Sequence, residues 1–125
     1  NESEIRNQLR DKFSHIEKII SKITKELNLK NCLVTMGKNG SVVYSKKDSK
    51  FYYSPAYASN IIDKDGAGDT LLAFFASNLA LKNNITTSMF ISSVAAGISV
   101  ENLANSSPIT KQSLIKKIKF LLYKK

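Results

Sequence analysis

The sequence predicts an α/β fold, and two features of its hydrophobic pattern predict it. A long segment with apolar residues three and four positions apart precedes a short β-branched run and two further strand-like segments. Three segments with helical character then occupy the second half of the chain. One clear central strand is too few for a stable doubly wound sheet. We therefore expect this chain to be part of a larger domain or to complete a sheet by dimerisation.

The first segment is expected to form one long helix over residues 4–27, ending near Asn28–Asn31. Its apolar side chains fall on a single helical stripe. They are Ile5, Leu9, Phe13, Ile16, Ile20, Ile23 and Leu27. His15 belongs to the same segment, where we expect a surface or boundary position and assign no role.

A buried strand and a hairpin are expected next. The run Cys32–Met36 is short and apolar, and its single thiol suits a buried strand position. Asn39-Gly40 is a strong hairpin signal. Two further strands are expected over residues 41–45 and 50–53, on either side of a polar turn.

Three helices are expected in the second half. The first ends at Asn83-Asn84, the second starts near Thr86, and the third is capped by Thr110. The second contains small residues that imply close packing against neighbouring backbone: Ser92, Ser93, Ala95, Ala96 and Gly97. The third is amphipathic, with an expected inward face of Leu114, Ile115, Ile118, Leu121 and Leu122.

The composition is that of a globular chain with the size of one domain. It has 125 residues, of which 42% are hydrophobic. No stretch of 18 or more residues is both uncharged and strongly apolar, and the polar N-terminus lacks the features of a signal peptide. A single cysteine cannot form an internal disulfide. These features favour a cytoplasmic protein without a membrane partner.

The chain is strongly basic, with a net charge of +9 from 19 basic and 10 acidic residues. Such a balance is also typical of proteins that bind nucleic acid. The lysines, however, are spread over the first segment, the hairpin and the last helix, and no interleaving of aromatic and basic residues is evident. We favour a solvated lysine face and expect no nucleic-acid partner. A basic nucleic-acid-binding domain is kept as an alternative hypothesis.

The most distinctive chemistry lies in residues 63–70, Asp63-Lys64-Asp65-Gly66-Ala67-Gly68-Asp69-Thr70. Small residues let the backbone approach a ligand, and their amides at a helix N-terminus form a nest for an anion. Asp69 would lie in the first helical turn, where a carboxylate is electrostatically favoured. With a phosphate in the nest, Asp69 is placed to accept the proton of an attacking hydroxyl. Thr70 could add a hydroxyl contact.

A purely structural interpretation competes with this one. Gly-x-Gly-Asp is also the pattern of a glycine turn before a helix. If the motif is considered by itself, this structural interpretation is favoured over a binding site. The crowding of Asp63, Asp65 and Asp69 into seven positions shifts the balance, since a cap needs only one carboxylate. Calcium binding is a further alternative, but the spacing and terminal glutamate of an EF-hand are absent.

This segment resembles the signature Asp-Thr-x-Gly-Ala-Gly-Asp-Thr of the ribokinase-like (PfkB) carbohydrate kinases. Three other segments resemble motifs of that family in the right order. Asn1-Glu2-Ser3-Glu4 resembles Asn-x-x-Glu, Thr35-Met36-Gly37-Lys38-Asn39-Gly40 resembles Thr-x-Gly-x-x-Gly, and Val94–Val100 resembles the Ala-rich helix beside the adenine pocket. The resemblance covers essentially the whole chain and leans toward the heptose-phosphate kinase branch.

The resemblance implies a ribokinase-like, Rossmann-like three-layer fold, of which residues 1–125 would be the C-terminal, ATP-binding part. It also implies transfer of the γ-phosphate of ATP to a hydroxyl of a small sugar or sugar phosphate. The implied roles are catalytic base for Asp69; anion hole for Gly66, Ala67 and Gly68; nucleotide contact for Thr35, Gly37 and Gly40; and Mg²⁺ binding through water for Glu4 and Asn1.

Several of these residues also have a structural interpretation. Asn1 and Glu4 could only start a helix, Thr35 could be an ordinary strand residue, and Gly37 could be a hairpin glycine. Asn102 and Asn105 are expected to be turn residues rather than readers of the base.

The sequence departs from the family pattern in three respects. Lys64 and Asp65 stand where the family usually has threonine, which leaves a monovalent cation open. Ser93 and Ala104 replace an asparagine and a glycine near the adenine site. Family kinases are also substantially longer, so we expect the N-terminal sugar-binding half to be absent and this chain alone to be inactive. The alternative function is a non-catalytic nucleotide-binding module or an oligomerisation module, and a homo-oligomer is left open.

Overall fold

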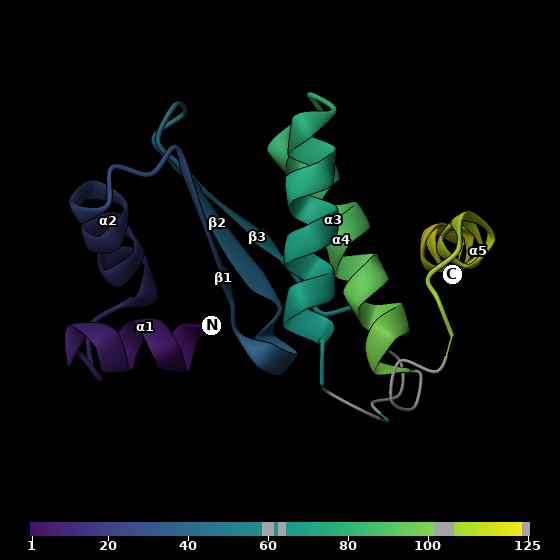
Figure 1. Cartoon of the computed structure of the whole chain (residues 1–125), viewed down its shortest axis with the longest axis horizontal. Helices are drawn as coiled ribbons and strands as arrows, with labels where there is room; N and C mark the ends of the chain where they lie inside the picture. Colours follow the sequence, from purple (N-terminus) through teal and green to yellow (C-terminus); the bar gives the residue numbers. More distant parts are fainter. Residues whose placement is uncertain (59–61, 63–64, 102–106, 124–125) are drawn as a thin grey trace. The chain divides into compact units, whose positions relative to one another are not determined.

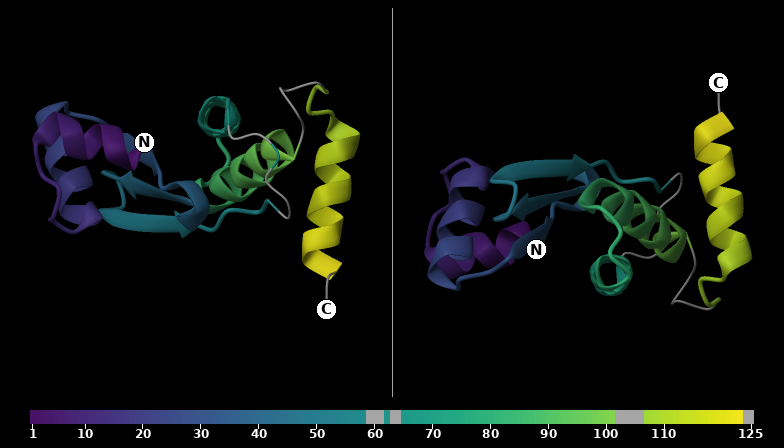
Figure 2. Two further views of the ribbon diagram at one scale, coloured as in Figure 1. Left: turned by 90° about the horizontal axis from the view of Figure 1, so that it is seen from below. Right: turned by 90° about the horizontal axis from the view of Figure 1, so that it is seen from above.

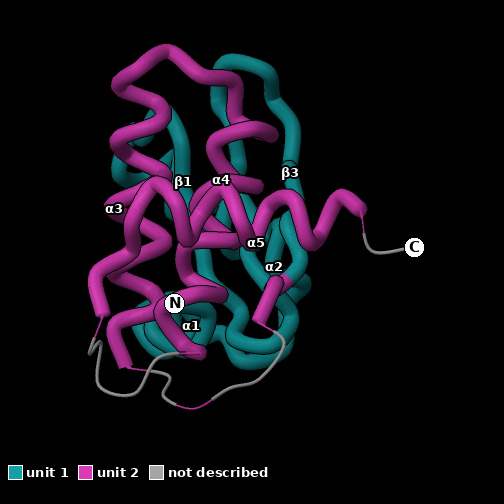
Figure 3. Tube along the Cα trace, turned by 90° about the vertical axis from the view of Figure 1, so that its right-hand side faces the viewer, with its two compact units in different colours: residues 1–55 teal, residues 56–125 magenta. Residues whose placement is uncertain are grey.

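The computed structural model describes residues 1–58, 62, 65–101 and 107–123. The chain divides into two compact units, Asn1–Pro55 and Ala56–Lys125 (Figure 3), and each is described by itself. Among the described residues, the first contains two α-helices, one short 3₁₀ helix and three strands, and the second contains three α-helices (Figure 1). No helix in these described ranges has both the length and the apolar character needed to cross a membrane.

The segment expected to form one long helix forms two, so that prediction is wrong. α1 (Glu2–Leu9) ends at Arg10, whose left-handed backbone has φ 51°. Asp11 then turns the chain, because its Oδ1 accepts hydrogen bonds from the amides of Phe13 (3.2 Å) and Ser14 (2.9 Å). α2 (Ile16–Glu26) starts after this turn. Phe13 lies between the helices and is 97% exposed, rather than on the apolar stripe.

The three expected strands are confirmed. β1 (Asn31–Thr35), β2 (Ser41–Ser45) and β3 (Lys50–Ser54) form an antiparallel sheet in the order β1-β2-β3. The core of this unit joins the helices to the sheet through Ile5, Ile19, Ile20, Cys32, Val34 and Val42. Burial raises the pKa of the Cys32 thiol, as expected for a cysteine on a buried strand.

The hairpin between β1 and β2 is also confirmed, and its turn is a short 3₁₀ helix, η1 (Gly37–Asn39). The Met36 amide donates to the Gly40 carbonyl over 2.8 Å and closes the turn. Gly40 has φ 86°, and a Cβ there would lie 2.0 Å from the Ser54 carbonyl oxygen. Only glycine therefore fits at this position.

The second unit contains α3 (Ala67–Ala80), α4 (Ile85–Val100) and α5 (Lys111–Tyr123). α3 and α4 lie side by side and antiparallel (Figure 1). α4 starts at an Asn84 cap, with Asn84 Oδ1 accepting from the Thr87 amide over 2.8 Å. A Cβ at Gly97 would lie only 3.1 Å from the Tyr57 carbonyl carbon, so the predicted close approach of backbone to α4 is confirmed.

α5 lies next to α4 (Figure 2) and begins at the predicted cap, where Thr110 Oγ1 accepts from the Ser113 amide over 3.1 Å. The Lys117 ammonium pairs with Glu101 at the end of α4, at 2.7 Å from Oε1. The apolar face is only partly covered: Ile115 and Leu122 are exposed, although both were expected to point inward.

Candidate active site

The candidate site residues fall in both units. Five lie in the first unit: Asn1, Glu4, Thr35, Gly37 and Gly40. Four lie in the second: Gly66, Ala67, Gly68 and Asp69. Asp63, Lys64, Asn102, Ala104 and Asn105, which the sequence also singled out, lie outside the described residues.

The glycine segment forms a left-handed turn directly before α3. Gly66 is the N-cap residue, with φ 77° and ψ −5°, and its carbonyl accepts from the Thr70 amide over 2.9 Å to close the first helical turn. Asn1 and Asn84 cap α1 and α4 with their side chains, but Gly66 has no side chain with which to cap α3. This helix N-terminus is therefore suited to an anion that would accept from its first amides.

Nothing in the described part of the chain requires glycine at position 68. Its φ is not in the left-handed region, and a Cβ built there meets no heavy atom within 4 Å in the described part of the chain. Glycine inside a helix costs roughly 1 kcal/mol relative to alanine. A residue that weakens α3 without easing any packing is consistent with a ligand that approaches the backbone closely.

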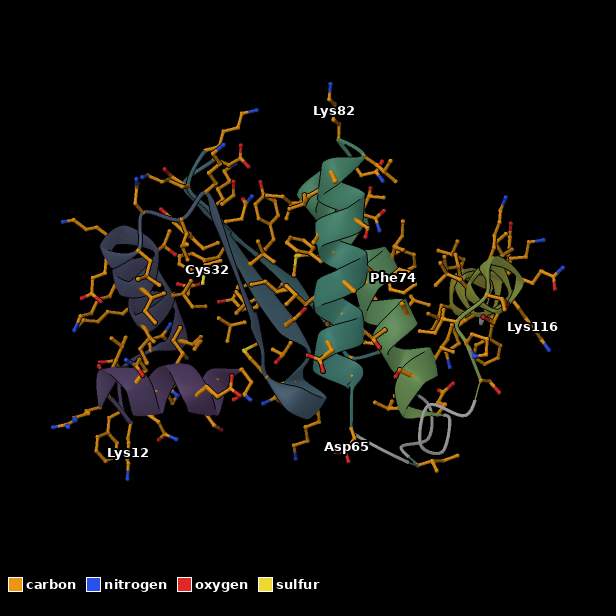
Figure 4. The ribbon with its side chains drawn as sticks, viewed as in Figure 1. Lys12, Cys32, Asp65, Phe74, Lys82 and Lys116 are labelled. Atoms are coloured by element: carbon orange, nitrogen blue, oxygen red, sulfur yellow. The ribbon has the colours of Figure 1, made fainter. Side chains whose placement is uncertain are left out.

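Asp69 lies in the first turn of α3, and its side chain is exposed. The partial positive charge at the helix N-terminus stabilises a carboxylate in this turn. Asp65 is also exposed and lies at the foot of α3, with Lys82 beyond its far end (Figure 4). The exposed Asp69 and Gly68 are adjacent residues on the same helical turn.

The end of α4 contacts this turn at Thr70 and contacts the chain before the turn at Ile62. The Thr70 hydroxyl lies 3.5 Å from Ser99 Oγ, to which it donates, and the Ile62 amide donates to the Val100 carbonyl over 2.8 Å. Ser99 is buried, with 4% of its surface exposed. Sequence reasoning gave no role to Ser99, because the two partners lie 29 residues apart and only the small size of the α4 side chains was visible in the sequence.

Asn1 and Glu4 form a capping box at the start of α1. Asn1 Oδ1 accepts from the Glu4 amide over 3.0 Å, and the Asn1 backbone nitrogen donates to Glu4 Oε2 over 2.6 Å. The pair therefore forms the helix start that its structural interpretation predicts. Glu4 is nevertheless exposed, so the capping contact does not bury its carboxylate.

Thr35, Gly37 and Gly40 surround the β1–β2 turn. Thr35 is the last residue of β1, half-buried and paired in register with Ser41. Gly37 has φ 57°, and a Cβ there would have open space in the described part of the chain. Gly37 is thus required by backbone conformation alone, whereas Gly40 is required by packing as well.

Comparison with models of known protein families identifies the family of this chain. The model of the pfkB family carbohydrate kinases matches residues 1–112, which is most of the chain. This chain belongs to the pfkB carbohydrate kinase family. The family resemblance carried by the sequence motifs is thereby confirmed.

Individual pfkB relatives agree with this assignment. The chain is 31% identical over 86 residues to an uncharacterized sugar kinase of Buchnera aphidicola, covering 69% of this chain and 27% of that protein. It is 34% identical over 88 residues to the bifunctional protein HldE of Campylobacter curvus, covering 70% of this chain and 18% of that protein. The chain thus spans about a quarter or less of the length of these curated relatives.

Solved structures confirm the ribokinase-like α/β fold. Ribokinase from Thermotoga maritima aligns with a TM-score of 0.82 at 29% identity, covering 95% of this chain and 40% of that one. Arabidopsis thaliana ribokinase, solved in complex with ribose and ATP, aligns with a TM-score of 0.84 at 26% identity, covering 96% of this chain and 39% of that one.

Proposed function

We propose that this protein acts as an ATP-dependent sugar kinase, transferring the γ-phosphate of ATP to a hydroxyl of a sugar or sugar phosphate. One observation carries the proposal: beside the exposed Asp69, Gly66 supplies no side-chain cap to α3, and the space at Gly68 is not filled by any described residue. Membership of the pfkB family supports it, as does similarity to a ribokinase that binds ribose and ATP.

In the proposed mechanism Asp69 is the general base. It takes the proton of the attacking sugar hydroxyl as the new oxygen–phosphorus bond forms and the bond between the γ-phosphorus and the bridging oxygen of ADP breaks. The amides of Gly66, Ala67 and Gly68 donate to the transferring phosphoryl group, whose charge they stabilise without reorganising. An exposed carboxylate next to open backbone amides is the arrangement this step requires.

The nucleotide phosphates are proposed to contact the β1–β2 turn through Thr35, Gly37 and Gly40. A glycine with a left-handed backbone, such as Gly37, directs successive amides toward one side of a turn, which suits an anion. Thr35 adds a half-buried hydroxyl at the end of β1. These residues would hold the donor, whereas Asp69 acts on the acceptor.

The donors in the described part of the chain fit magnesium held through water. These residues contain no group of three or more His, Cys, Asp or Glu side chains that could hold a metal directly. Magnesium keeps several of its waters and needs only one or two carboxylates. Glu4 is exposed and already oriented by Asn1, so it can accept from such waters. When bound, the ion would neutralise the phosphate oxygens of the donor.

The test is Asp69→Asn, with Asp65→Asn as a control of equal charge change in the same loop. ATP turnover is measured with a panel of pentoses, hexose phosphates and heptose phosphates on the full gene product. We expect Asp69→Asn to lower kcat by about 10²- to 10⁴-fold and Asp65→Asn to change it far less. Wild-type turnover in Asp69→Asn would rule out the proposed base.

A second outcome would favour the alternative function. If the wild-type protein binds ATP in calorimetry but turns over none of the sugars, a non-catalytic nucleotide-binding module derived from such kinases explains the glycine turn better. The two functions are therefore separated by turnover rather than by nucleotide binding.

A further inference from the structure

We propose that Ser99 is a positioning residue, which orients Asp69 by holding Thr70 from the end of α4. The inference rests on the proposed function, because it assumes that Asp69 carries the reaction. Ser99 does not touch the reacting groups itself; it acts through the neighbouring turn of α3.

The first argument is the position of the two contacts. Ile62 precedes the glycine turn and Thr70 follows it, and both bond to consecutive residues of α4, at Val100 (2.8 Å) and Ser99 (3.5 Å). The last turn of α4 therefore holds the chain on both sides of the glycine turn. Gly66 and Gly68 give this segment more backbone freedom than other residues would, so contacts from outside the segment help to fix it.

The second argument is geometric. Asp69 and Thr70 are adjacent on α3, so any rotation of this turn about the helix axis moves both side chains together. Fixing the Thr70 hydroxyl therefore fixes the direction in which the Asp69 carboxylate leaves the helix. Catalysis by a general base is sensitive to displacements of about 1 Å, so this constraint bears on rate.

The third argument separates positioning from folding. α3 and α4 pack side by side, and both helices carry buried apolar side chains: Leu71 and Phe75 on α3, and Val94 on α4. Burial of apolar side chains is in general the main source of stability where two helices pack. Removing the Ser99 hydroxyl leaves these contacts in place, so its loss is expected to affect the turn carrying Asp69 more than the stability of the unit.

The test compares Ser99→Ala with Ser92→Ala in the full gene product. Ser92 is the matched control, because it is also buried on α4 and, among the described residues, its hydroxyl donates only within that helix, to the Ser88 carbonyl. We expect Ser99→Ala to lower kcat about two- to threefold with the KM for ATP unchanged, the effect of a neutral hydrogen bond at the weak end of the usual range, because the contact is long at 3.5 Å. Ser92→Ala should leave kcat unchanged.

Two further variants identify the partner. Thr70→Val should lower kcat as much as Ser99→Ala does, whereas Thr70→Ser should keep the wild-type kcat. Because the two residues share one contact, the double variant Thr70→Val/Ser99→Ala should have the same kcat as either single variant. An unchanged kcat in Ser99→Ala, an equal loss in Ser92→Ala, or additive losses in the double variant would overturn the proposal.

Amide hydrogen exchange tests the contact independently of catalysis. The Thr70 amide bonds to the Gly66 carbonyl, so a loosened first turn of α3 exchanges faster. We expect faster exchange in Ser99→Ala than in Ser92→Ala, even if no sugar is turned over and the proposed function fails. Equal exchange in both variants would overturn the positioning role, whatever the activity.

Discussion

At the scale of single residues, glycine is required for different reasons at different positions of this chain. Gly40 is required by packing and conformation, since its Cβ would collide with the Ser54 carbonyl. Gly66 is required by its left-handed backbone. Gly68 satisfies neither requirement, because its surroundings in the described residues are open and its φ is ordinary. A cost to helix stability with no packing gain suggests selection for ligand access.

This difference predicts opposite effects on stability and activity. Gly68→Ala should stabilise the protein by about 0.5–1 kcal/mol, because alanine favours the helix, while the added methyl group lowers kcat by obstructing the phosphoryl group. Thermal unfolding and ATP turnover measure the two effects. Gly40→Ala is the comparison, and should lower the unfolding temperature strongly. A Gly68→Ala variant that is both stabilised and fully active would show that no ligand approaches this backbone.

The candidate site was predictable from sequence where its residues are neighbours in the chain. The Gly66–Asp69 segment carries its own turn and helix start, and the structure shows both. Ser99 could not be predicted, because its relation to Thr70 depends on how two helices pack. Local chemistry is visible in a sequence, whereas contacts across 29 residues are determined by tertiary packing.

At the scale of secondary structure, the same distinction explains the helix that was wrongly predicted as continuous. The apolar stripe over residues 4–27 is real for Ile5, Ile20 and Ile23, which lie in or against the core. The periodicity did not reveal the interruption, because Asp11 ends the regular backbone through its own side-chain hydrogen bonds. The Ser14 hydroxyl and amide also lower the pKa of Asp11, so this turn is held by an ionised carboxylate at neutral pH.

α2 and β3 are joined by a contact that predicts a dependence on pH. The Tyr53 hydroxyl donates to Glu17 Oε1 over 2.6 Å. Desolvation, together with the hydrogen bond and the charge of Glu17, raises the pKa of Tyr53 to about 12. An acid whose pKa is raised in the folded state contributes stability that is complete below its ordinary pKa near 10 and is lost as the pH approaches 12.

Tyr53→Phe removes this contribution and is the variant to compare with wild type. The difference in unfolding midpoint between the two proteins should be constant below about pH 9 and should shrink as the pH rises above 10. Glu17→Gln should move the Tyr53 titration, followed by ultraviolet absorbance, back toward pH 10. A difference that stays constant up to pH 12 would contradict the contact.

At the scale of the whole molecule, the α/β class was predictable, because the periodicity of apolar residues and the turn residues indicated each strand and each helix after Gly66. The identity of the family also followed from the sequence, since its motifs appear in order along the chain and the family model matches residues 1–112. The exposed side of α5 was not predictable. Periodicity shows that Ile115 and Leu122 share an apolar face, but it does not show how much of that face α4 covers.

The proposed roles, with the β1–β2 turn holding ATP and Asp69 acting on the sugar hydroxyl, also make a prediction for the whole protein. A ligand that binds only the folded state stabilises it by RT ln(1 + [L]/Kd), about 2.7 kcal/mol at one hundred times Kd. Mg²⁺-ATP should therefore raise the unfolding temperature of the full gene product. Asp69→Asn should show the same rise, because Asp69 is proposed to act on the sugar hydroxyl rather than to hold the nucleotide.

Variants of the β1–β2 turn should behave in the opposite way. Thr35→Val preserves the shape of a half-buried strand residue but removes its hydroxyl, so the stabilisation by Mg²⁺-ATP should fall while the unfolding temperature without ligand stays close to wild type. Differential scanning calorimetry with and without Mg²⁺-ATP measures both. If Asp69→Asn loses the stabilisation by Mg²⁺-ATP and Thr35→Val keeps it, the proposed roles are wrong. The Asp69 carboxylate would then hold the nucleotide, and the glycines of the β1–β2 turn would be explained by the hairpin conformation alone.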